Sequence, residues 1–212
     1  MNIHKVYAVF MAYFRPRRIR AFRERFPEID SGASVLDVGG SLGWWKMVAP
    51  GNIRLTILNI TPEEREEVES RGYRFVLGDG CSLPFADQEF DLVLSNSVIE
   101  HVGSFDDQRR FAHEVMRCGK RVYVQTPSKW FPVEPHLIAV GIHWLPFVVA
   151  RSLVRWFSVW GWVTKPSQQQ IDSFLSQTRL LNRREVGELF PICQIGTERF
   201  AGLTKSFLIT RQ

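Results

Sequence analysis

The residues best suited to chemistry by type and spacing lie in the stretch 34–45. A short apolar run ends in an acid, and residues that favour a tight turn follow: Asp37, Gly39, Gly40, Ser41 and Gly43. This order predicts a strand, a turn and a helix N-terminus, whose backbone N–H groups can approach a nucleotide-like ligand closely. The spacing does not fit the dinucleotide pattern G-x-G-x-x-G, because Ser41 and Trp44 stand at its third and sixth positions.

Polar residues also end the next three predicted strands. Asn59 closes the second strand, Asp79 and Gly80 follow the third, and Asn96 follows the fourth. In an open parallel sheet, ligands bind outside the carboxyl ends of the strands. Four successive strands with hydrogen-bonding residues at these ends therefore predict one ligand site there.

Histidines beside acids follow the fourth and fifth strands. Glu100-His101 comes after the fourth strand, and Glu134 and His136 lie after the fifth, in a loop that prolines hold extended. An imidazole titrates near neutrality and can act as a general base. His101, His136 and Glu134 are therefore the catalytic candidates. The alternative is structural: Glu-His caps a helix, and the loop's polar groups satisfy its own backbone.

Strands alternate with helices along the first two thirds of the chain. The predicted strands are 34–38, 53–59, 73–77, 90–95 and 121–125, with a final pair at about 192–200 and 203–210. The alternation predicts an α/β fold with a parallel sheet and helices on both faces. We expect a single domain over 1–212, with an N-terminal helical segment at 1–30.

The segment 134–166 is apolar and rich in tryptophan, and we expect it to form a helical cap inserted after the fifth strand. Pro146, Arg151 and Arg155 interrupt its apolar part, 137–163, so it is not predicted to span a membrane. Mixed aromatic and basic residues suit a lid over an apolar pocket, or an interfacial helix in peripheral contact with a membrane. Plain core packing or a dimer interface is the remaining alternative.

Composition agrees with one globular domain. The chain has 212 residues, 45% of them hydrophobic, and 27 Lys+Arg against 22 Asp+Glu. The excess of arginine is concentrated at 15–25, where it suits a solvated helix face or contact with phosphates. Cys81, Cys118 and Cys193 have no C-x-x-C spacing, so we expect neither disulfides nor a zinc site, and a cytoplasmic location.

Two runs of sequence resemble a known family. Residues 78–96, GDGCSLPFADQEFDLVLSN, and 97–102, SVIEHV, are similar to the blocks "GDa…LPf.d.sFDlV.s" and "…lEHv" of class I S-adenosylmethionine (SAM)-dependent methyltransferases of the methyltransferase type 11-like family. The turn after Asp37 resembles the family's first motif, acid-x-Gly-x-Gly-x-Gly, with Ser41 in the place of the middle glycine. The resemblance covers residues 33–127 strongly and the remainder weakly.

This resemblance implies a Rossmann-like, seven-stranded, mostly parallel sheet with a C-terminal antiparallel strand, and SAM as cofactor. Asp37 and the glycine turn would face the sulfonium and amino acid moiety, and Asn59 the ribose. Asp79 and Gly80 would contact the adenine, with Asn96 at the next strand end. The family usually has an acid where this chain has Asn59, so a weaker, neutral contact is expected there.

The expected reaction is methyl transfer to a small, hydrophobic or lipid-like acceptor, more readily on oxygen than on nitrogen or carbon. Some ubiquinone-pathway O-methyltransferases carry Glu-x-x-Glu-His, but here Ser97 replaces the first glutamate, so no metal is predicted. A non-catalytic SAM-binding or regulatory module is one alternative, supported by Asn59 and Ser41. An RNA methyltransferase is another, suggested by the arginines; the Asn/Asp-Pro-Pro-aromatic signature is missing after the fourth strand, so nucleic acid is not the expected partner.

Overall fold

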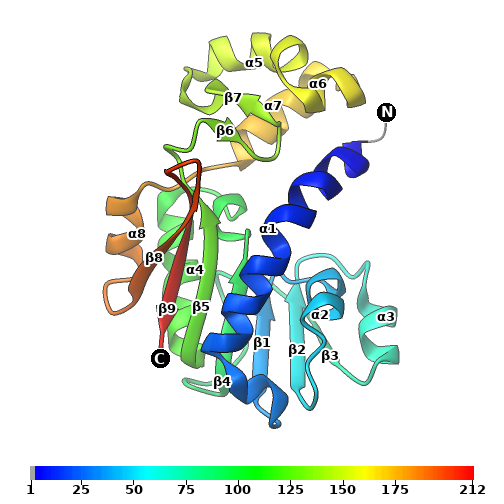
Figure 1. Ribbon diagram of the computed structural model, residues 1–212, viewed down its shortest axis with the longest axis vertical. Helices are drawn as coiled ribbons and strands as arrows, with labels where there is room; N and C mark the ends of the chain where they lie inside the picture. Colours follow the sequence, from blue (N-terminus) through cyan, green and yellow to red (C-terminus); the bar gives the residue numbers. More distant parts are fainter. Residues whose placement is uncertain (1–2) are drawn as a thin grey trace.

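A seven-stranded sheet forms the centre of the computed structural model, in the order β3-β2-β1-β4-β5-β9-β8 (Figure 1). The structure describes residues 3–212, with side chains from Phe14 onward; residues 1–2 of the expected N-terminal segment lie outside the described part. The strands are β1 (Ser34–Val38), β2 (Arg54–Asn59), β3 (Arg74–Leu77), β4 (Phe90–Asn96), β5 (Gly119–Pro127), β8 (Gln194–Phe200) and β9 (Leu203–Arg211). β9 is antiparallel to both β5 and β8, whereas β1 to β5 are mutually parallel. The expected mostly parallel sheet with a C-terminal antiparallel strand is confirmed.

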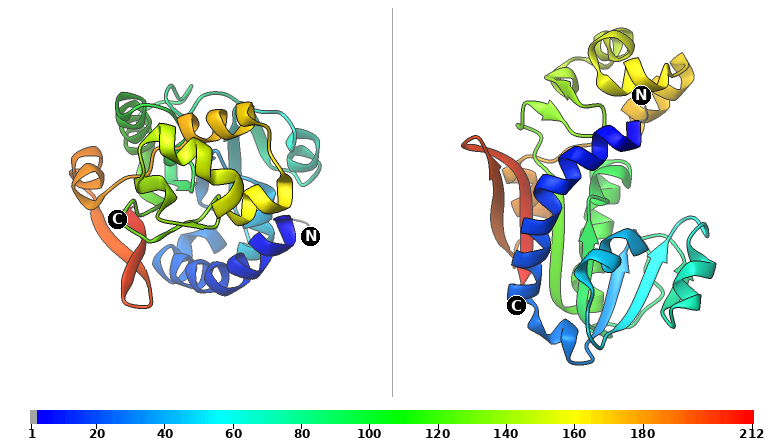
Figure 2. Two further views of the ribbon diagram at one scale, coloured as in Figure 1. Left: turned by 90° about the horizontal axis from the view of Figure 1, so that it is seen from above. Right: turned by 45° about the vertical axis from the view of Figure 1, so that its right-hand side comes forward.

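Helices cover both faces of this sheet (Figure 2). α1 (Ile3–Arg25), α2 (Leu42–Val48) and α3 (Arg65–Ser70) pack on one face, and α4 (Phe105–Cys118) and α8 (Arg183–Leu189) on the other. The central strands are buried on both sides, which explains why β1 and β4 are almost continuously apolar. Phe22 of α1 is fully buried, with its ring centroid 5.1 Å from that of Tyr123 on β5, and it anchors α1 to the sheet.

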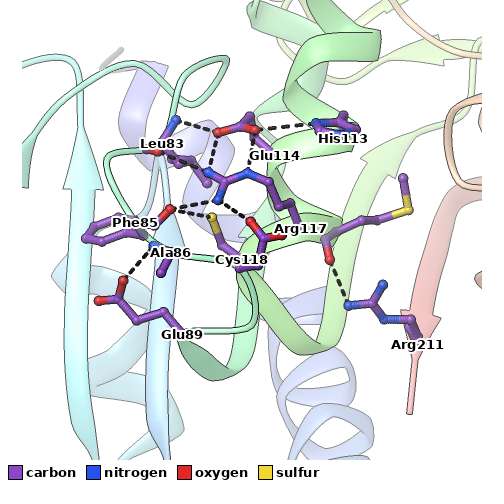
Figure 3. A network of polar contacts seen from close by, with 11 residues as sticks. Leu83, Phe85, Ala86, Glu89, His113, Glu114, Arg117, Cys118 and Arg211 are labelled. Carbon is purple, nitrogen blue, oxygen red and sulfur yellow. Dashed lines mark hydrogen bonds and ion pairs between the residues drawn. The ribbon is translucent and has the colours of Figure 1, made fainter.

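α4 fixes the loop between β3 and β4 through a polar network (Figure 3). Arg117 donates hydrogen bonds to the carbonyls of Phe85 (2.7 Å) and Leu83 (3.2 Å) and pairs with Glu114 at 2.8 Å. Glu114 in turn accepts a hydrogen bond from the backbone N–H of Leu83 at 2.9 Å. Arg117 lowers the pKa of Glu114 to about 2, so this carboxylate stays ionised. The network holds the loop that leads from the end of β3 into β4.

A cap of small elements lies over the carboxyl ends of the strands (Figure 1). It contains β6 (Val133–Glu134), β7 (Ala139–Val140), the 3-10 helix η3 (Ile142–Trp144), α5 (Phe147–Phe157), α6 (Val159–Thr164) and α7 (Gln168–Gln177). Its own core is made by residues from the β6–β7 turn to α7: Leu137, Ala139, Ile142, Ala150, Val154 and Ile171. Arg151 of α5 pairs with Asp172 of α7 at 2.6 Å, so the packed unit continues beyond residue 166, the expected boundary.

α5 and α6 approach each other closely at one glycine. A Cβ at Gly161 would lie 2.4 Å from the carbonyl oxygen of Val154, so this crossing requires glycine. Both helices are short, 11 and 6 residues. None of the described helices combines the length and apolar character needed to cross a bilayer.

Candidate functional site

The glycine turn after β1 needs glycine at two successive positions. Gly39 has φ of +71°, and a Cβ there would lie 2.6 Å from the Val98 side chain. A Cβ on Gly40 would lie 1.8 Å from Oδ2 of Asp37. The backbone of the turn is therefore pressed against the Asp37 carboxylate, and any side chain would displace one of them.

α2 begins immediately after this turn. Ser41 takes the N-cap position, but its hydroxyl makes no capping hydrogen bond. The N–H of Leu42 donates instead to Oε2 of Glu64, at 2.8 Å. Gly43 has open space around it, with the nearest atom to an added Cβ at 3.6 Å, so packing does not require glycine there.

Asp37 is a buried carboxylate with one uncompensated oxygen. Only 1% of the residue is exposed; Oδ2 accepts a hydrogen bond from Trp45 Nε1 at 2.7 Å, and Oδ1 has no partner among the described residues. Burial raises the pKa of Asp37 to about 7, against the Trp45 hydrogen bond, which lowers it, while the charge of Glu64 adds to the rise. A cation placed at Oδ1 would satisfy this oxygen and favour the ionised form.

Asn59, Asp79 and Gly80 are already engaged within the protein. Asn59 donates its side-chain amide to the carbonyl of Gly40 at 3.2 Å. Asp79 is exposed and accepts a hydrogen bond from the N–H of Cys81 at 2.8 Å. Gly80 is buried, and a Cβ there would lie 2.6 Å from the ring of Phe111, so packing alone requires this glycine.

Asn96, at the end of β4, is held by an arginine from the first helix. Arg18 is 8% exposed and donates to Oδ1 of Asn96 at 3.0 Å and to Oε1 of Gln125 at 2.9 Å. It also forms an ion pair with Glu198 at 2.7 Å. This role of Arg18 is not predictable from the sequence. Its only signal was the excess of arginine at 15–25, which was assigned to a solvated face or to phosphate contacts.

His101 and His136 meet across the site. His101 lies in the 3-10 helix η2 (Ile99–His101), and its Nε2 is 3.2 Å from Nε2 of His136. Nδ1 of His136 is 2.7 Å from Oε1 of Glu134, and Oε2 of Glu134 accepts a hydrogen bond from the N–H of Leu137 at 2.5 Å. Glu134 is 2% exposed, so it is an inward-facing carboxylate that holds His136. The three catalytic candidates therefore form one continuous chain of contacts.

The two imidazoles of this chain differ in basicity. Burial, followed by the neighbouring His136, lowers the pKa of His101 to about 4. Burial also acts to lower the pKa of His136, but the hydrogen bond to Glu134 and the charges of Glu134 and Glu100 outweigh it, so the net shift is upward. A proton shared by the pair therefore resides on His136.

Glu100 lies next to the two histidines. It is fully buried; Oε2 accepts a hydrogen bond from the Thr126 hydroxyl at 3.0 Å, and Oε1 has no partner among the described residues. Burial raises the pKa of Glu100 to about 7. Donor atoms of Glu100, His101 and His136 lie within 4.8 Å of one another, a spacing that a divalent ion would also accept. The two imidazole nitrogens are 3.2 Å apart, a separation that suits a shared proton and equally suits two ligands of one ion.

A cavity of about 960 Å³ joins the glycine turn to the histidine pair. Of the predicted site residues, those that line it are Asp37, Gly39, Gly40, Ser41, Asn96, His101 and His136. Asn59, Asp79, Gly80, Gly43 and Glu134 do not line it. The cap contributes apolar side chains to the wall: Phe131, Val133, Ile138, Trp160 and Phe174. Arg15, Arg18 and Lys205 also line the cavity, so it has an apolar side and a basic side.

Comparison with known proteins finds similarity to methyltransferases over a region that contains the glycine turn. Residues 36–121 match the family model of the methyltransferase domain. An uncharacterized methyltransferase of Mycobacterium sp. (strain JLS) is 37% identical over 90 residues, which cover 41% of this chain and 34% of that protein. The chain thus spans about a third of the length of that curated relative.

Two further similarities extend over more of the chain. A malonyl-[acyl-carrier protein] O-methyltransferase of Pseudescherichia vulneris is 25% identical over 158 residues, which cover 70% of this chain and 63% of that protein. The crystal structure of magnesium protoporphyrin IX methyltransferase from Synechocystis PCC 6803, with S-adenosylhomocysteine bound, superposes with a TM-score of 0.62 at 13% identity. That similarity covers 100% of this chain and 88% of the other. The chain is thus similar to methyltransferases in sequence over residues 36–121, and its overall fold is similar to that of a solved methyltransferase.

Proposed function

We propose that this protein transfers the methyl group of SAM to an oxygen atom of a small, apolar acceptor. The observation that carries the proposal is the cavity that connects the glycine turn with the His101–His136 pair. It offers a place for the cofactor at one end and for an acceptor, with a base beside it, at the other.

The residues around the turn fit the cofactor. The unpartnered Oδ1 of Asp37 suits the ammonium group of the methionine moiety, and the bare backbone of Gly39 and Gly40 permits close approach. Asn59, Asp79 and Gly80 remain our candidates for the adenosine half; Asn59 would exchange its bond to the Gly40 carbonyl for a ribose hydroxyl. When bound, SAM supplies a methyl group on a sulfonium, which leaves as neutral S-adenosylhomocysteine when the carbon–sulfur bond breaks.

The cap side of the cavity fits an apolar acceptor. Ile138, Trp160 and Phe174 present aliphatic and aromatic surface there, and Trp160 stacks on Phe174 with a centroid distance of 5.6 Å. Apolar walls with a few polar groups are typical of small-molecule sites. The apolar outer face of the same cap also suits peripheral contact with a membrane.

The histidine pair supports the proposal of an oxygen acceptor. An acceptor hydroxyl must lose its proton as its oxygen bonds to the methyl carbon. The His101–His136 pair would take this proton, and Glu134 and Glu100 would stabilise the charge on His136. Positioning of acceptor and methyl group, with water kept out by the cap, would supply the remaining acceleration.

Two measurements test the proposal. Calorimetric titration with SAM should show one site, and incubation of the protein and SAM with a cell lipid extract should release S-adenosylhomocysteine. Binding without any release, across extracts, would support the non-catalytic alternative. Release that requires RNA and weakens with salt would support the RNA alternative; Arg18 and Arg23 count against it, because they pair internally with Glu198 and Asp30.

A further inference from the structure

Exposed apolar side chains concentrate on the outer surface of the cap. Among the residues whose side chains the structure describes, most large apolar side chains that are well exposed fall between 130 and 162. We call this set the cap face: Trp130, Val140, Trp144, Leu145, Phe147, Val148, Val149, Trp156, Phe157 and Trp162. The cap forms one end of the molecule, with α5 outermost (Figure 1). A soluble surface rarely gathers so many such side chains without a partner.

Several of these side chains belong to α5 and α6, which pack on the core of the cap. Ala150 and Val154 of α5 are buried in the cap core, whereas the side chains of Val148, Trp156 and Phe157 are 71%, 66% and 68% exposed. Trp162 Nε1 donates a hydrogen bond to the carbonyl of Trp156 at 2.5 Å. The exposure is therefore built into the packing of α5 and α6.

The charges around the cap face are of one sign. The stretch 135–171 contains Arg151, Arg155 and Lys165 and neither Asp nor Glu. Arg151 is neutralised by Asp172, whereas Arg155 is exposed and lies over the Trp156 ring at 6.0 Å. Lys129 likewise lies 5.8 Å from the ring of Trp130. Two tryptophans of the cap face thus each have a cation beside them, and tryptophan and basic residues are both typical of the interface of a membrane with water.

We propose that the cap face docks on the surface of an anionic lipid bilayer without crossing it. α5 is 11 residues long and would reach only about 16 Å, against a hydrocarbon thickness of about 30 Å, so the helix would lie in the interface. A second copy is the weaker occupant, since a two-fold contact through this face would bring Arg155 and Lys165 against the same cations. Anionic headgroups, by contrast, complement them.

Docking would place the cavity next to the bilayer. Trp160 and Ile138 of the cap line the cavity from the inner side while the cap face points outward. This consequence, that an apolar acceptor reaches the site from the membrane, rests on the proposed function. The docking itself does not.

Vesicle co-sedimentation tests the docking directly, with neither SAM nor acceptor present. The protein should sediment with vesicles of phosphatidylcholine mixed with phosphatidylglycerol, less with phosphatidylcholine alone, and less at high salt. Phe157→Ala should weaken binding about tenfold, and Arg155→Gln about fivefold on the anionic vesicles only. Ile192→Ala is the matched control, because Ile192 is 66% exposed but lies outside the cap, and its variant should bind as the parent does.

The outcomes separate docking from catalysis. Circular dichroism and thermal unfolding of each variant establish that the fold is intact. Docking is overturned if the intact protein ignores both kinds of vesicle, or if Phe157→Ala and Ile192→Ala behave alike. A dimer in sedimentation velocity that Phe157→Ala dissociates, without vesicle binding, would assign the cap face to a second copy. A failed SAM titration would refute the proposed function and leave vesicle binding unaffected.

Discussion

Replacing Asp37 with asparagine should stabilise the ligand-free protein at high pH and weaken SAM binding. Burial raises the pKa of Asp37 from 3.8 to about 7, so the folded state holds a proton that the unfolded state releases between these values. Stability therefore falls as pH rises through this window and stays low above it. Each pKa unit corresponds to about 1.4 kcal/mol. The full cost of the ionised carboxylate is on the order of 2–4 kcal/mol.

Asparagine resembles the protonated acid in shape and can still accept the hydrogen bond from Trp45. At pH 5, only about one pH unit above the unfolded-state pKa, the free energy of unfolding of Asp37→Asn should exceed that of the parent protein by about 1–2 kcal/mol. At pH 8 the free energy of unfolding of the variant should exceed that of the parent protein by about 2–4 kcal/mol, the cost of the ionised carboxylate. Urea unfolding at both pH values measures the difference. Asp106→Asn, an exposed carboxylate on α4, is the control and should show no such dependence.

The same variant should bind SAM more weakly, because the ammonium group loses a charged partner worth about 1.5–3 kcal/mol, or roughly 10- to 150-fold in affinity. In the parent protein, affinity should fall below pH 7, since binding must then displace the proton on Asp37. Calorimetry from pH 5.5 to 8 measures this. An Asp37→Asn protein that binds SAM like the parent, or gains equal stability at pH 5 and 8, would refute the reasoning.

Four further predictions follow from the site and its supports. His136→Asn should lower kcat about 10²- to 10⁴-fold in a single-turnover assay, with little change in SAM affinity in a binding assay. An equal loss of kcat and of SAM affinity would speak against a role of His136 as base. Gly40→Ala should abolish SAM binding, because its Cβ would overlap the Asp37 carboxylate, whereas Gly43→Ala should fold and bind; calorimetry distinguishes them. Arg117→Ala should destabilise the fold by about 2–3 kcal/mol in urea, through loss of charged hydrogen bonds, and an unchanged midpoint would contradict the network. Dialysis against EDTA should leave methyl transfer intact; activity lost and then restored by Zn²⁺ would instead make Glu100, His101 and His136 a metal site.

Local patterns were sufficient for the sheet. Apolar runs that end at turn residues placed β1 to β5 within two residues of their observed bounds, and the Asp37 turn marked the carboxyl edge. Such patterns depend only on residues that are neighbours in the sequence, so the sequence alone is enough to predict the strands.

Contacts across the fold were not readable in this way. His101 and His136 were each named, but their contact requires the cap to bring a loop 35 residues away over η2. The burial of Arg18 is not predictable, because its partners come from β4, β5 and β8, and the residues next to it in the sequence do not distinguish a buried arginine from an exposed one. Asn59 was expected to face the ligand, yet its amide turns back to the Gly40 carbonyl, a choice that only the shape of the turn determines.

The ion pair of Arg18 with Glu198 has a consequence for the order in which the protein can be assembled. The two residues are 180 positions apart, and Gln125, the second partner, is 107 positions from Arg18. Synthesis of the buried arginine therefore precedes that of the acid that neutralises it by 180 residues. Until β8 is in place, the Arg18 end of α1 lacks its charged partner, so we expect the wall of the cavity that it forms to be completed late in folding.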